Sequence, residues 1–388
     1  MSSKLRVALL FGGRSGEHEV SVASAASVMQ ALDARKYDVL PVYLTPQGRW
    51  LPAVSPLQLL EGRGDAPSRT AVLLSGDPQC RGLVPLDARR EVQAVDVVFP
   101  LLHGTYGEDG TVQGLLELAD LPYVGAGVLG SAVGMDKGVM KALFQQAGLP
   151  VVPHLVIRRH EWERQPRQVE ERILDILPLP LFVKPANLGS SVGVTKVKQA
   201  TELAAALARA AQYDRRLLVE QGLECRELEC GVLGNEEPMA SVVGEVVPRR
   251  EFYDYQAKYT PGLSELRIPA PVAPEVAAAV QRLALAAFRA IDAAGLARVD
   301  CFLERRSGAI YVNEINTLPG FTTVSMYPKL WEASGIPYAA LLDRLIELAL
   351  EHYRERKRCQ TTYRPESSAL PELEATEKEG DLPGRRLG

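Results

Sequence analysis

Two apolar runs near the end of the chain carry polar residues at alternating positions. Arg298 and Asp300 lie on the first run, and Glu314 and Asn316 lie on the second. If the three residues 306–308 form the turn, with Gly308 in the left-handed conformation, Asp300 faces Glu314 across a hairpin. Because strand side chains alternate with a period of two, all four polar side chains then share one face.

Three oxygen-bearing side chains on a rigid face are suited to Mg²⁺, which prefers a few carboxylates together with substrate phosphates. The alternative is a charged ladder facing solvent. Two opposed carboxylates would repel each other there, at a cost of about 0.2 to 1 kcal/mol. The apolar neighbours favour burial, so we interpret Asp300, Glu314 and Asn316 as metal ligands.

A lysine followed by a loop of small residues occurs at 182–193, with the sequence FVKPANLGSSVG. Such a loop can present backbone N–H groups and hydroxyls to phosphates, while Lys184 supplies positive charge. A plain turn with a solvated lysine is the alternative. The chain has no GxxxxGK[ST] motif, so a bound ATP would be held without a P-loop.

Three further segments combine polar residues with glycine or aromatic residues. Residues 16–21 and 101–110 follow expected strands, and open α/β sheets bind ligands at the carboxyl ends of their strands. His103 lies among glycines, where a core role would be unusual, although a loop histidine without a role is the alternative. Residues 253–262 form an aromatic-rich segment that could be a lid or an ordinary exposed loop.

Residues 125–130, GAGVLG, match the GxGxxG fingerprint of dinucleotide-binding proteins. That fingerprint needs a hydrophobic strand before it and an acidic residue about 20 positions later. A short segment containing a proline precedes this match, and residues 145–150 bring no acid. The sequence therefore disfavours a nicotinamide dehydrogenase.

The elements that must position these residues follow an α/β pattern. Apolar runs at 5–11, 37–43 and 95–100 predict strands of an open parallel sheet, and residues 52–92 are interpreted as a peripheral insertion. A helix is expected from Lys137 to Gln146, because Gly148 and Pro150 follow it. We expect domains at 1–134, 135–231 and 232–357, followed by a disordered tail at 358–388 that is rich in charge, Pro and Gly.

Composition narrows the class of protein. Apolar residues make up 46% of the 388 residues and charged residues 24%, as in ordinary globular proteins. The net charge is −4 without a basic stripe, so nucleic acid is not an expected partner. No apolar run reaches the length of a membrane span, and no secretory leader is apparent, so no membrane partner is expected. Five cysteines without CxxC spacing indicate reduced thiols and a cytoplasmic location.

Taken together, these segments resemble the D-alanine:D-alanine ligases of the ATP-grasp type, from residue 4 to about 355. The motifs that carry the resemblance are GGRSGEHEVS at 12–21, LLHGTYGEDG at 101–110, MDK at 135–137, FVKPANLGSSVG at 182–193, VEQGL at 219–223, YDYQAKY at 253–259, ARVDCF at 297–302 and NEINTLPGFTTVSMYP at 313–328. The resemblance implies a three-domain ATP-grasp architecture with ATP between the central and C-terminal units.

The resemblance also implies a role for each matching residue. For the nucleotide phosphates, the matching residues are Lys137, Lys184 and Lys258, covered by Ser190 and Ser191. Glu220 and Leu223 would flank the adenine, and Phe302 would pack on it. Glu227 would hold the ribose. Asp300, Glu314 and Asn316 would bind two Mg²⁺ ions, with Mn²⁺ as a substitute. Glu17 and His103 would bind the first D-alanine, Ser325 and Met326 the second, and Glu17, Ser190 and Tyr259 would form a closing triad. Arg298 and the N–H of Gly320 would form an oxyanion hole. Many relatives carry leucine where this chain has Met326.

The implied reaction is ATP-dependent joining of two D-alanine molecules through an acyl phosphate, which would supply peptidoglycan precursors. Tyr259 favours an amine nucleophile over the hydroxyl of D-lactate, so a depsipeptide ligase is the alternative within the family. A non-catalytic nucleotide-binding regulator is the alternative outside it. A homodimer is expected by analogy.

Overall fold

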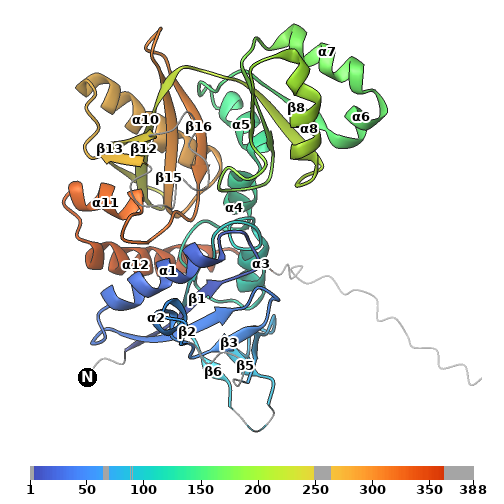
Figure 1. The fold of residues 1–388 in the computed structure, drawn as a ribbon. Coiled ribbons are helices and arrows are strands. Elements are labelled where there is room, and N and C mark those ends of the chain that lie inside the picture. Colours follow the sequence, from blue (N-terminus) through green and yellow to red (C-terminus); the bar gives the residue numbers. More distant parts are fainter. Residues whose placement is uncertain (1–3, 64–69, 88, 90, 249–263, 362–388) are drawn as a thin grey trace, which may run out of the picture.

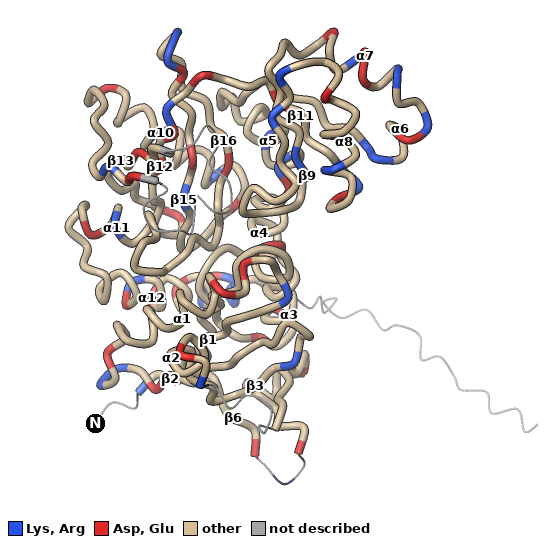
Figure 2. The backbone as a smooth tube through the Cα atoms, viewed as in Figure 1, with Lys and Arg blue, Asp and Glu red and all other residues tan. Residues whose placement is uncertain are grey.

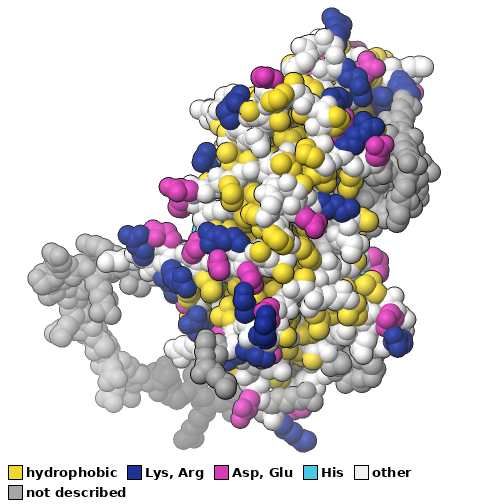
Figure 3. Space-filling view, turned by 90° about the vertical axis from the view of Figure 1, so that its left-hand side faces the viewer, with side chains coloured by type: hydrophobic (Ala, Val, Ile, Leu, Met, Phe, Trp, Pro, Cys, Tyr) yellow, Lys and Arg dark blue, Asp and Glu magenta, His cyan; other side chains and the backbone are white. Residues whose placement is uncertain are grey.

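The computed structural model describes residues 4–63, 70–87, 89, 91–248 and 264–361. They form three β-sheets with helices packed around them (Figure 1). No helix in these ranges is long and apolar enough to cross a membrane. All five cysteines lie in these ranges and are free. Lys and Arg are interspersed with Asp and Glu along the backbone (Figure 2), and both signs lie side by side on the face shown in Figure 3.

The first sheet is built around β1 (Leu5–Gly12), which is flanked in parallel by β2 (Tyr37–Leu44) and β7 (Val97–Leu101). Six successive residues of β1 are buried, which explains its uninterrupted apolar sequence. Helix α1 (His18–Ala31) begins after the glycine turn that ends β1. The strand predicted at 5–11 is therefore confirmed, and the turn that follows it carries Glu17.

Residues 52–92 are more than the peripheral insertion that the sequence suggested. The segment 50–94, which includes them, contains β3 (Trp50–Pro52), α2 (Pro56–Leu60), β4 (Val72–Leu74), β5 (Gly82–Pro85) and β6 (Gln93–Ala94), whose strands extend the sheet in the order β6-β5-β4-β3-β2-β1-β7. These added strands pair antiparallel, so the sheet is mixed rather than parallel throughout. Strands of two to four residues are too short to show a period of two, which is why the sequence pattern missed them.

Three helices connect the first sheet to the second. They are α3 (Thr111–Leu118), α4 (Val128–Met135) and α5 (Lys137–Gln146), and the bounds of α5 match the prediction. The side chain of Asp136 caps α5 by accepting the N–H groups of Gly138 and Val139, at 3.0 Å each. The same side chain accepts a hydrogen bond from Arg216 Nη1 at 2.6 Å, which links the start of α5 to the second sheet.

The second sheet has the order β10-β9-β11-β8 and is antiparallel. Its elements are β8 (His154–Arg158), α6 (Arg159–Arg164), α7 (Pro166–Ile176), β9 (Leu181–Pro185), β10 (Thr195–Val197), a 3-10 turn (Ala200–Glu202), α8 (Leu203–Ala211) and β11 (Arg216–Gln221). Their apolar side chains form a core that lies within residues 157–219.

The third sheet has the order β14-β13-β12-β15-β16 and is also antiparallel. Its elements are β12 (Cys225–Gly234), β13 (Met239–Pro248), β14 (Ser264–Arg267), α10 (Pro274–Ala290), β15 (Gly295–Glu304), β16 (Ile310–Asn316), α11 (Met326–Ala333) and α12 (Tyr338–Arg356). Helix α12 lies between this sheet and the first one (Figure 1), and one core joins Leu345 of α12 to Leu9 and Phe99 of the first sheet.

The hairpin of β15 and β16 places Asp300 opposite Glu314, as predicted, by a route that the sequence did not show. Near the turn, the Glu304 N–H donates to Ala309 O at 2.9 Å, so the loop spans the four residues 305–308, and the predicted three-residue turn is wrong. Gly308 does adopt the left-handed conformation, with φ +72°. A bulge at Asn313 then adds one residue to β16 and restores the predicted pairing.

Candidate active site

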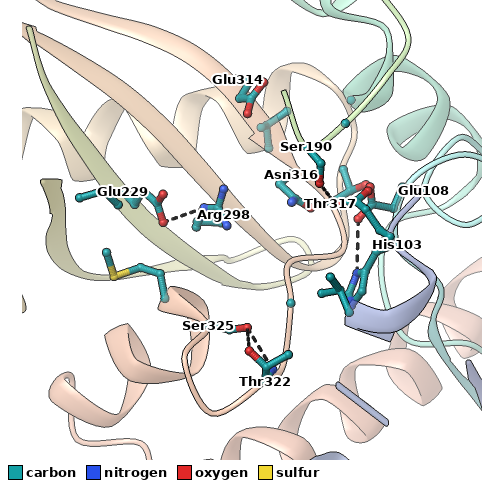
Figure 4. A pocket seen from close by; sticks show the side chains of 18 of the residues that line it. His103, Glu108, Ser190, Glu229, Arg298, Glu314, Asn316, Thr317, Thr322 and Ser325 are labelled. Carbon is teal, nitrogen blue, oxygen red and sulfur yellow. Dashed lines mark hydrogen bonds and ion pairs between the residues drawn. The ribbon is translucent and has the colours of Figure 1, made fainter. Parts of the chain in front are cut away.

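Two adjoining cavities, of about 450 and 510 Å³, lie where the three sheets meet. Residues Lys137, Gly189, Ser190, Glu229 and Glu314 line both of them. The first cavity is lined by residues expected at the amino-acid site (Figure 4), and the second by residues expected to hold the nucleotide. The loop after β9 therefore forms part of the boundary between the two sites.

Glu17 and Ser190 meet in the first cavity, although they come from different sheets. The Ser190 hydroxyl donates to Glu17 Oε1. Ser190 and Ser191 both have positive φ, at 52° and 56°, which is uncommon for residues with a side chain. Gly189 allows the close approach, because a Cβ at that position would lie 3.0 Å from Glu17 Oε2. This hydrogen bond joins the segment 182–193, which was predicted to contact phosphates, to the turn after β1 of the first sheet.

His103 is buried at the end of β7, and protein groups contact both ring nitrogens. Nδ1 lies 3.0 Å from Leu318 O, and Nε2 lies 3.0 Å from Ser24 Oγ. The sequence analysis missed Glu108, whose Oε1 lies 3.7 Å from Nδ1 (Figure 4). Burial opposes the charged imidazolium, but the Glu108 and Glu17 carboxylates outweigh it and raise the pKa of His103. A carboxylate five residues after a histidine in a glycine-rich loop was the only signal for Glu108 in the sequence.

Arg298 lies on the floor of the first cavity between two carboxylates. Its Nε and Nη2 each donate to Asp300 at 2.7 Å, and Nε lies 2.9 Å from Glu229 Oε2. Burial opposes its charge, but Asp300 and Glu229 together raise the pKa of Arg298 well above its usual value. The guanidinium therefore stays charged. Glu229 was missed, because its place two residues after Glu227 on β12 gives no separate pattern.

Gly320, Ser325 and Met326 form the far wall of the first cavity. A Cβ on Gly320 would lie 2.8 Å from Ser325 Oγ, so these two residues are close neighbours. The Thr322 N–H donates to Ser325 Oγ at 3.0 Å, which orients the hydroxyl (Figure 4). Met326 begins α11 directly after Ser325. The predicted residues for the second amino acid are thus brought together.

The second cavity gathers most of the predicted nucleotide residues. It is lined by Lys137, Lys184, Ser190, Ser191, Glu220, Leu223, Glu227, Asp300, Phe302 and Glu314. Phe182 and Val152 add apolar surface, as a planar base requires. Lys258 and Tyr259 lie outside the described residues, so the structure leaves their predicted roles untested.

Glu220 is buried beneath two lysines at one end of this cavity. Lys184 Nζ contacts one carboxylate oxygen, and Lys141 Nζ lies 2.7 Å from the other. Burial opposes its ionisation, but Lys141 and Lys184 outweigh burial and lower the pKa of Glu220 to about 2. The sequence analysis missed Lys141, which lies one helical turn after Lys137.

The predicted metal ligands share one end of the hairpin. Asp300 pairs with Glu314, Arg298 pairs with Asn316, and Lys137 Nζ lies 3.5 Å from Glu314 Oε2. Among the described residues, no group of three or more His, Cys, Asp and Glu could hold a metal ion. Two carboxylates and one amide fit Mg²⁺ only if phosphates complete the shell, as this ion's usual chemistry allows.

The glycine motif at 125–130 has a packing role. A Cβ on Gly130 would lie 2.9 Å from Asp292 O, and one on Gly134, one turn later, would lie 2.9 Å from Thr317 Cγ2. Small residues on α4 therefore allow this helix to approach the third sheet closely. The contact at Gly130 therefore explains this glycine without a dinucleotide.

Comparisons with known proteins agree with this geometry. Residues 6–126 match the family model described as D-ala D-ala ligase N-terminus, and residues 143–347 match that described as D-ala D-ala ligase C-terminus. The chain is 52% identical over 363 residues to the D-alanine–D-alanine ligase of Heliobacterium modesticaldum, covering 93% of this chain and 99% of that one. It is 49% identical over 366 residues to that of Geobacillus thermodenitrificans, with the same coverages.

Solved structures show the same likeness. The D-alanine-D-alanine ligase from Coxiella burnetii matches with a TM-score of 0.79 at 38% identity, covering 92% of this chain and 97% of that one. The VanG D-Ala:D-Ser ligase from Enterococcus faecalis matches with a TM-score of 0.81 at 35% identity, covering 89% and 100%. The chain therefore belongs to the D-alanine–D-alanine ligase family and has its ATP-grasp fold.

Proposed function

We propose that the protein joins two D-alanine molecules to D-alanyl-D-alanine in an ATP-dependent reaction that supplies peptidoglycan synthesis. The observation that carries this proposal is the pair of adjoining cavities that share Lys137, Ser190 and Glu314. A nucleotide in one cavity would bring its terminal phosphate to the boundary with the other. That arrangement is suited to activating a carboxylate by phosphoryl transfer.

In this proposal the second cavity holds ATP. Lys137 and Lys184 contact phosphates below Ser190 and Ser191, Glu220 and Leu223 flank adenine, Glu227 holds the ribose, and Phe302 packs on the base. Mg²⁺, held by Asp300, Glu314 and Asn316, supplies charge neutralisation between the phosphates and the carboxylate when bound. Arg298 donates one hydrogen bond to each oxygen of Asp300, which leaves a further lone pair on each oxygen for a metal ion.

The first cavity holds the two amino acids. Glu17, with His103 nearby, receives the ammonium of the first D-alanine, and Ser325 with the backbone at Met326 receives the carboxylate of the second. Forming a peptide bond in water is uphill, so the γ-phosphoryl group of ATP is first transferred to the carboxylate of the first D-alanine, which leaves ADP. The neutral amine of the second D-alanine then attacks the acyl phosphate, and inorganic phosphate leaves as the C–O bond breaks. Arg298 and the Gly320 N–H stabilise the oxyanion that develops, a kind of interaction worth about 2.7 to 4 kcal/mol per donor.

Several parts of the proposal rest on the family resemblance alone. Lys258 on the phosphates, Tyr259 as the third member of the closing triad, and the 253–262 segment as a lid belong here. The same holds for Mn²⁺ as a substitute ion and for a homodimer. A cytoplasmic location rests on the cysteine pattern, and the division into domains at about residues 134 and 231 rests on the order of the expected elements.

The test is product formation by the purified protein with ATP, Mg²⁺ and D-alanine, alone or mixed with D-serine or D-lactate, with products identified by mass. We expect D-alanyl-D-alanine and stoichiometric phosphate. The D-serine arm is included because a D-Ala:D-Ser ligase has the same fold. Preference for D-serine or D-lactate would overturn the assigned second substrate, and nucleotide binding without any product would favour a regulator.

A further inference from the structure

Lys141 is a fully buried lysine on α5. Its Nζ lies 2.7 Å from Glu220 Oε1 and donates to the Asn313 carbonyl at 2.9 Å. Residues on the same helix, including Met140 and Phe144, pack into the apolar core between α5 and the third sheet. A methionine or leucine would suit that environment better than an amine, because burying a charge is costly unless it is paired and hydrogen-bonded. The position of Lys141 therefore needs a reason beyond packing.

The first contact places Lys141 behind Glu220. Lys184 contacts the other oxygen of the same carboxylate, so one glutamate holds two lysines. Lys184 is also the lysine proposed to contact phosphates. If Lys141 were absent, Lys184 would be the remaining cation against a buried carboxylate, and its contact with Glu220 would compete more strongly with a nucleotide. Lys141 thus balances the negative charge of Glu220 and leaves Lys184 available to contact a nucleotide phosphate.

The second contact places Lys141 against the bulge of β16. Asn313 is the extra residue that brings Glu314 opposite Asp300, and Lys141 binds its carbonyl oxygen. One ammonium group therefore links a carboxylate that lines the second cavity to the backbone that sets the register of the acidic residues. Lys137, one turn earlier on α5, lies 3.5 Å from Glu314 itself.

We propose that Lys141 is a positioning residue for nucleotide binding, which acts by fixing Glu220 and the Asn313 bulge without touching the nucleotide. The proposal rests on the second cavity being the nucleotide site. It assigns Lys141 an effect on nucleotide affinity that should be separable from any effect on the amino-acid site, because the described contacts of its ammonium group lie on the nucleotide side.

The test is the Lys141→Met variant, which keeps the length of the side chain and removes the charge. Binding of a non-hydrolysable ATP analogue with Mg²⁺ is measured by calorimetry without D-alanine, and KM for ATP and for D-alanine are measured separately. We expect the Kd for the analogue and the KM for ATP to rise about 10- to 100-fold, as for loss of one charge-assisted hydrogen bond. The KM for D-alanine should stay within about twofold.

Two further variants exclude a general structural effect. Lys36→Met removes an exposed lysine that is paired with Asp343, and it should leave nucleotide affinity unchanged. In a Glu220→Gln background, Lys141→Met should weaken binding less than it does in the wild-type background, because the contact with Glu220 is already lost and only the contact with the Asn313 carbonyl remains. Full additivity of the two changes would overturn the proposal.

Unchanged nucleotide affinity in a folded Lys141→Met protein would also overturn it. If that variant does not fold, Lys141→Gln, which keeps a donor, is judged by the same criteria, and failure of both to fold would assign Lys141 to stability alone. The binding assay contains no amino acid. The Lys141 proposal can therefore fail while the wild-type protein still makes D-alanyl-D-alanine, so the two proposals are tested separately.

Discussion

Arg298 is the residue on which the charge balance of the first cavity depends. Two carboxylates, from Asp300 and Glu229, hold its guanidinium in place, and the planar fork makes two parallel bonds to Asp300. A lysine carries the same charge but cannot reproduce that geometry. The arginine is therefore oriented before any substrate binds, which is what stabilisation of a developing oxyanion requires.

We predict that Arg298→Lys lowers kcat by roughly 100- to 1000-fold, the usual cost of losing an oriented oxyanion donor. The affinity for the ATP analogue should fall much less than kcat, because Arg298 lines the first cavity and reaches the second only through Asp300. Steady-state kinetics and calorimetry measure the two effects. Arg344→Lys on α12, which removes a surface pairing with Glu351, is the matched control. A comparable loss of nucleotide affinity would contradict the role assigned to Arg298.

His103 and Glu108 form a buried acid–base pair whose titration can be observed directly. Glu108→Gln removes a carboxylate that favours the charged imidazolium. Burial, which disfavours that charge, is then less opposed, and the pKa of His103 should fall below its wild-type value. Because the pKa of His103 is raised in the folded protein, its stabilising effect is present below 6.5 and is lost as the pH rises through the folded value. The free energy of unfolding of the Glu108→Gln variant should therefore depend less on pH in this range.

Histidine NMR across the pH range measures the prediction, and the other four histidines of the chain serve as internal references. A His103 resonance that titrates as in the wild type would show that Glu108 does not control it.

At the scale of elements, α5 carries both Lys137 and Lys141, so the start of this helix controls two lysines near the second cavity. Asp136 sets that start by accepting two backbone N–H groups and the Arg216 side chain. The hairpin of β15 and β16 has a comparable role for the acids. Its four-residue loop and its bulge offset each other, and Asp300 and Glu314 face each other as a result.

Asp136→Ala should lower the free energy of unfolding by about 1 to 3 kcal/mol, from loss of the helix cap and of a partly buried ion pair. The KM for ATP should rise as well, because both lysines follow directly on the helix. Urea denaturation and kinetics provide the measurements. Asp175→Ala, at an exposed position near the end of α7, is the control. Equal stability of the two variants would show that the cap contributes nothing.

At the scale of the whole molecule, some hydrophobic cores are shared between sheets, and one belongs to a single sheet. One core joins the first sheet to α12 and to residues around Phe321, so the first and third sheets should unfold together. The second sheet has a core of its own within residues 157–219. A unit with its own core can unfold locally while the rest of the molecule stays folded. The segment 182–193, which was predicted to contact phosphates, belongs to this unit.

We therefore predict that hydrogen exchange in β9 and β11 is faster than in β1 and β2, and that the ATP analogue with Mg²⁺ slows it. Exchange followed by mass spectrometry measures both regions in one sample, and β1 is the internal control. Uniform protection of all three sheets, with or without nucleotide, would show that the molecule opens as a single unit.

The sequence by itself determined the elements with long apolar periodicity and the motifs at their ends. Strands β1 and β2 could be predicted because a buried element several residues long shows its apolar pattern in the sequence, and helix α5 because Gly148 and Pro150 mark its end. The opposed pair Asp300 and Glu314 was predicted correctly only because the longer loop and the bulge at Asn313 offset each other. The short strands of residues 50–94 and the bulge could not be predicted, because a few residues show no period and a bulge has no distinct composition.

Only the tertiary structure decided which charges compensate each other. Glu229 and Lys141 gave no motif, since their meaning depends on partners on other elements. Glu108 lies in the 101–110 motif only five residues from His103, but the sequence does not show that folding buries the two side chains together. Glu229 meets Arg298 across neighbouring strands, and Lys141 reaches Glu220 across the junction of α5 and the second sheet. Burial makes such pairs strong, and burial is a property of the folded chain rather than of the residue.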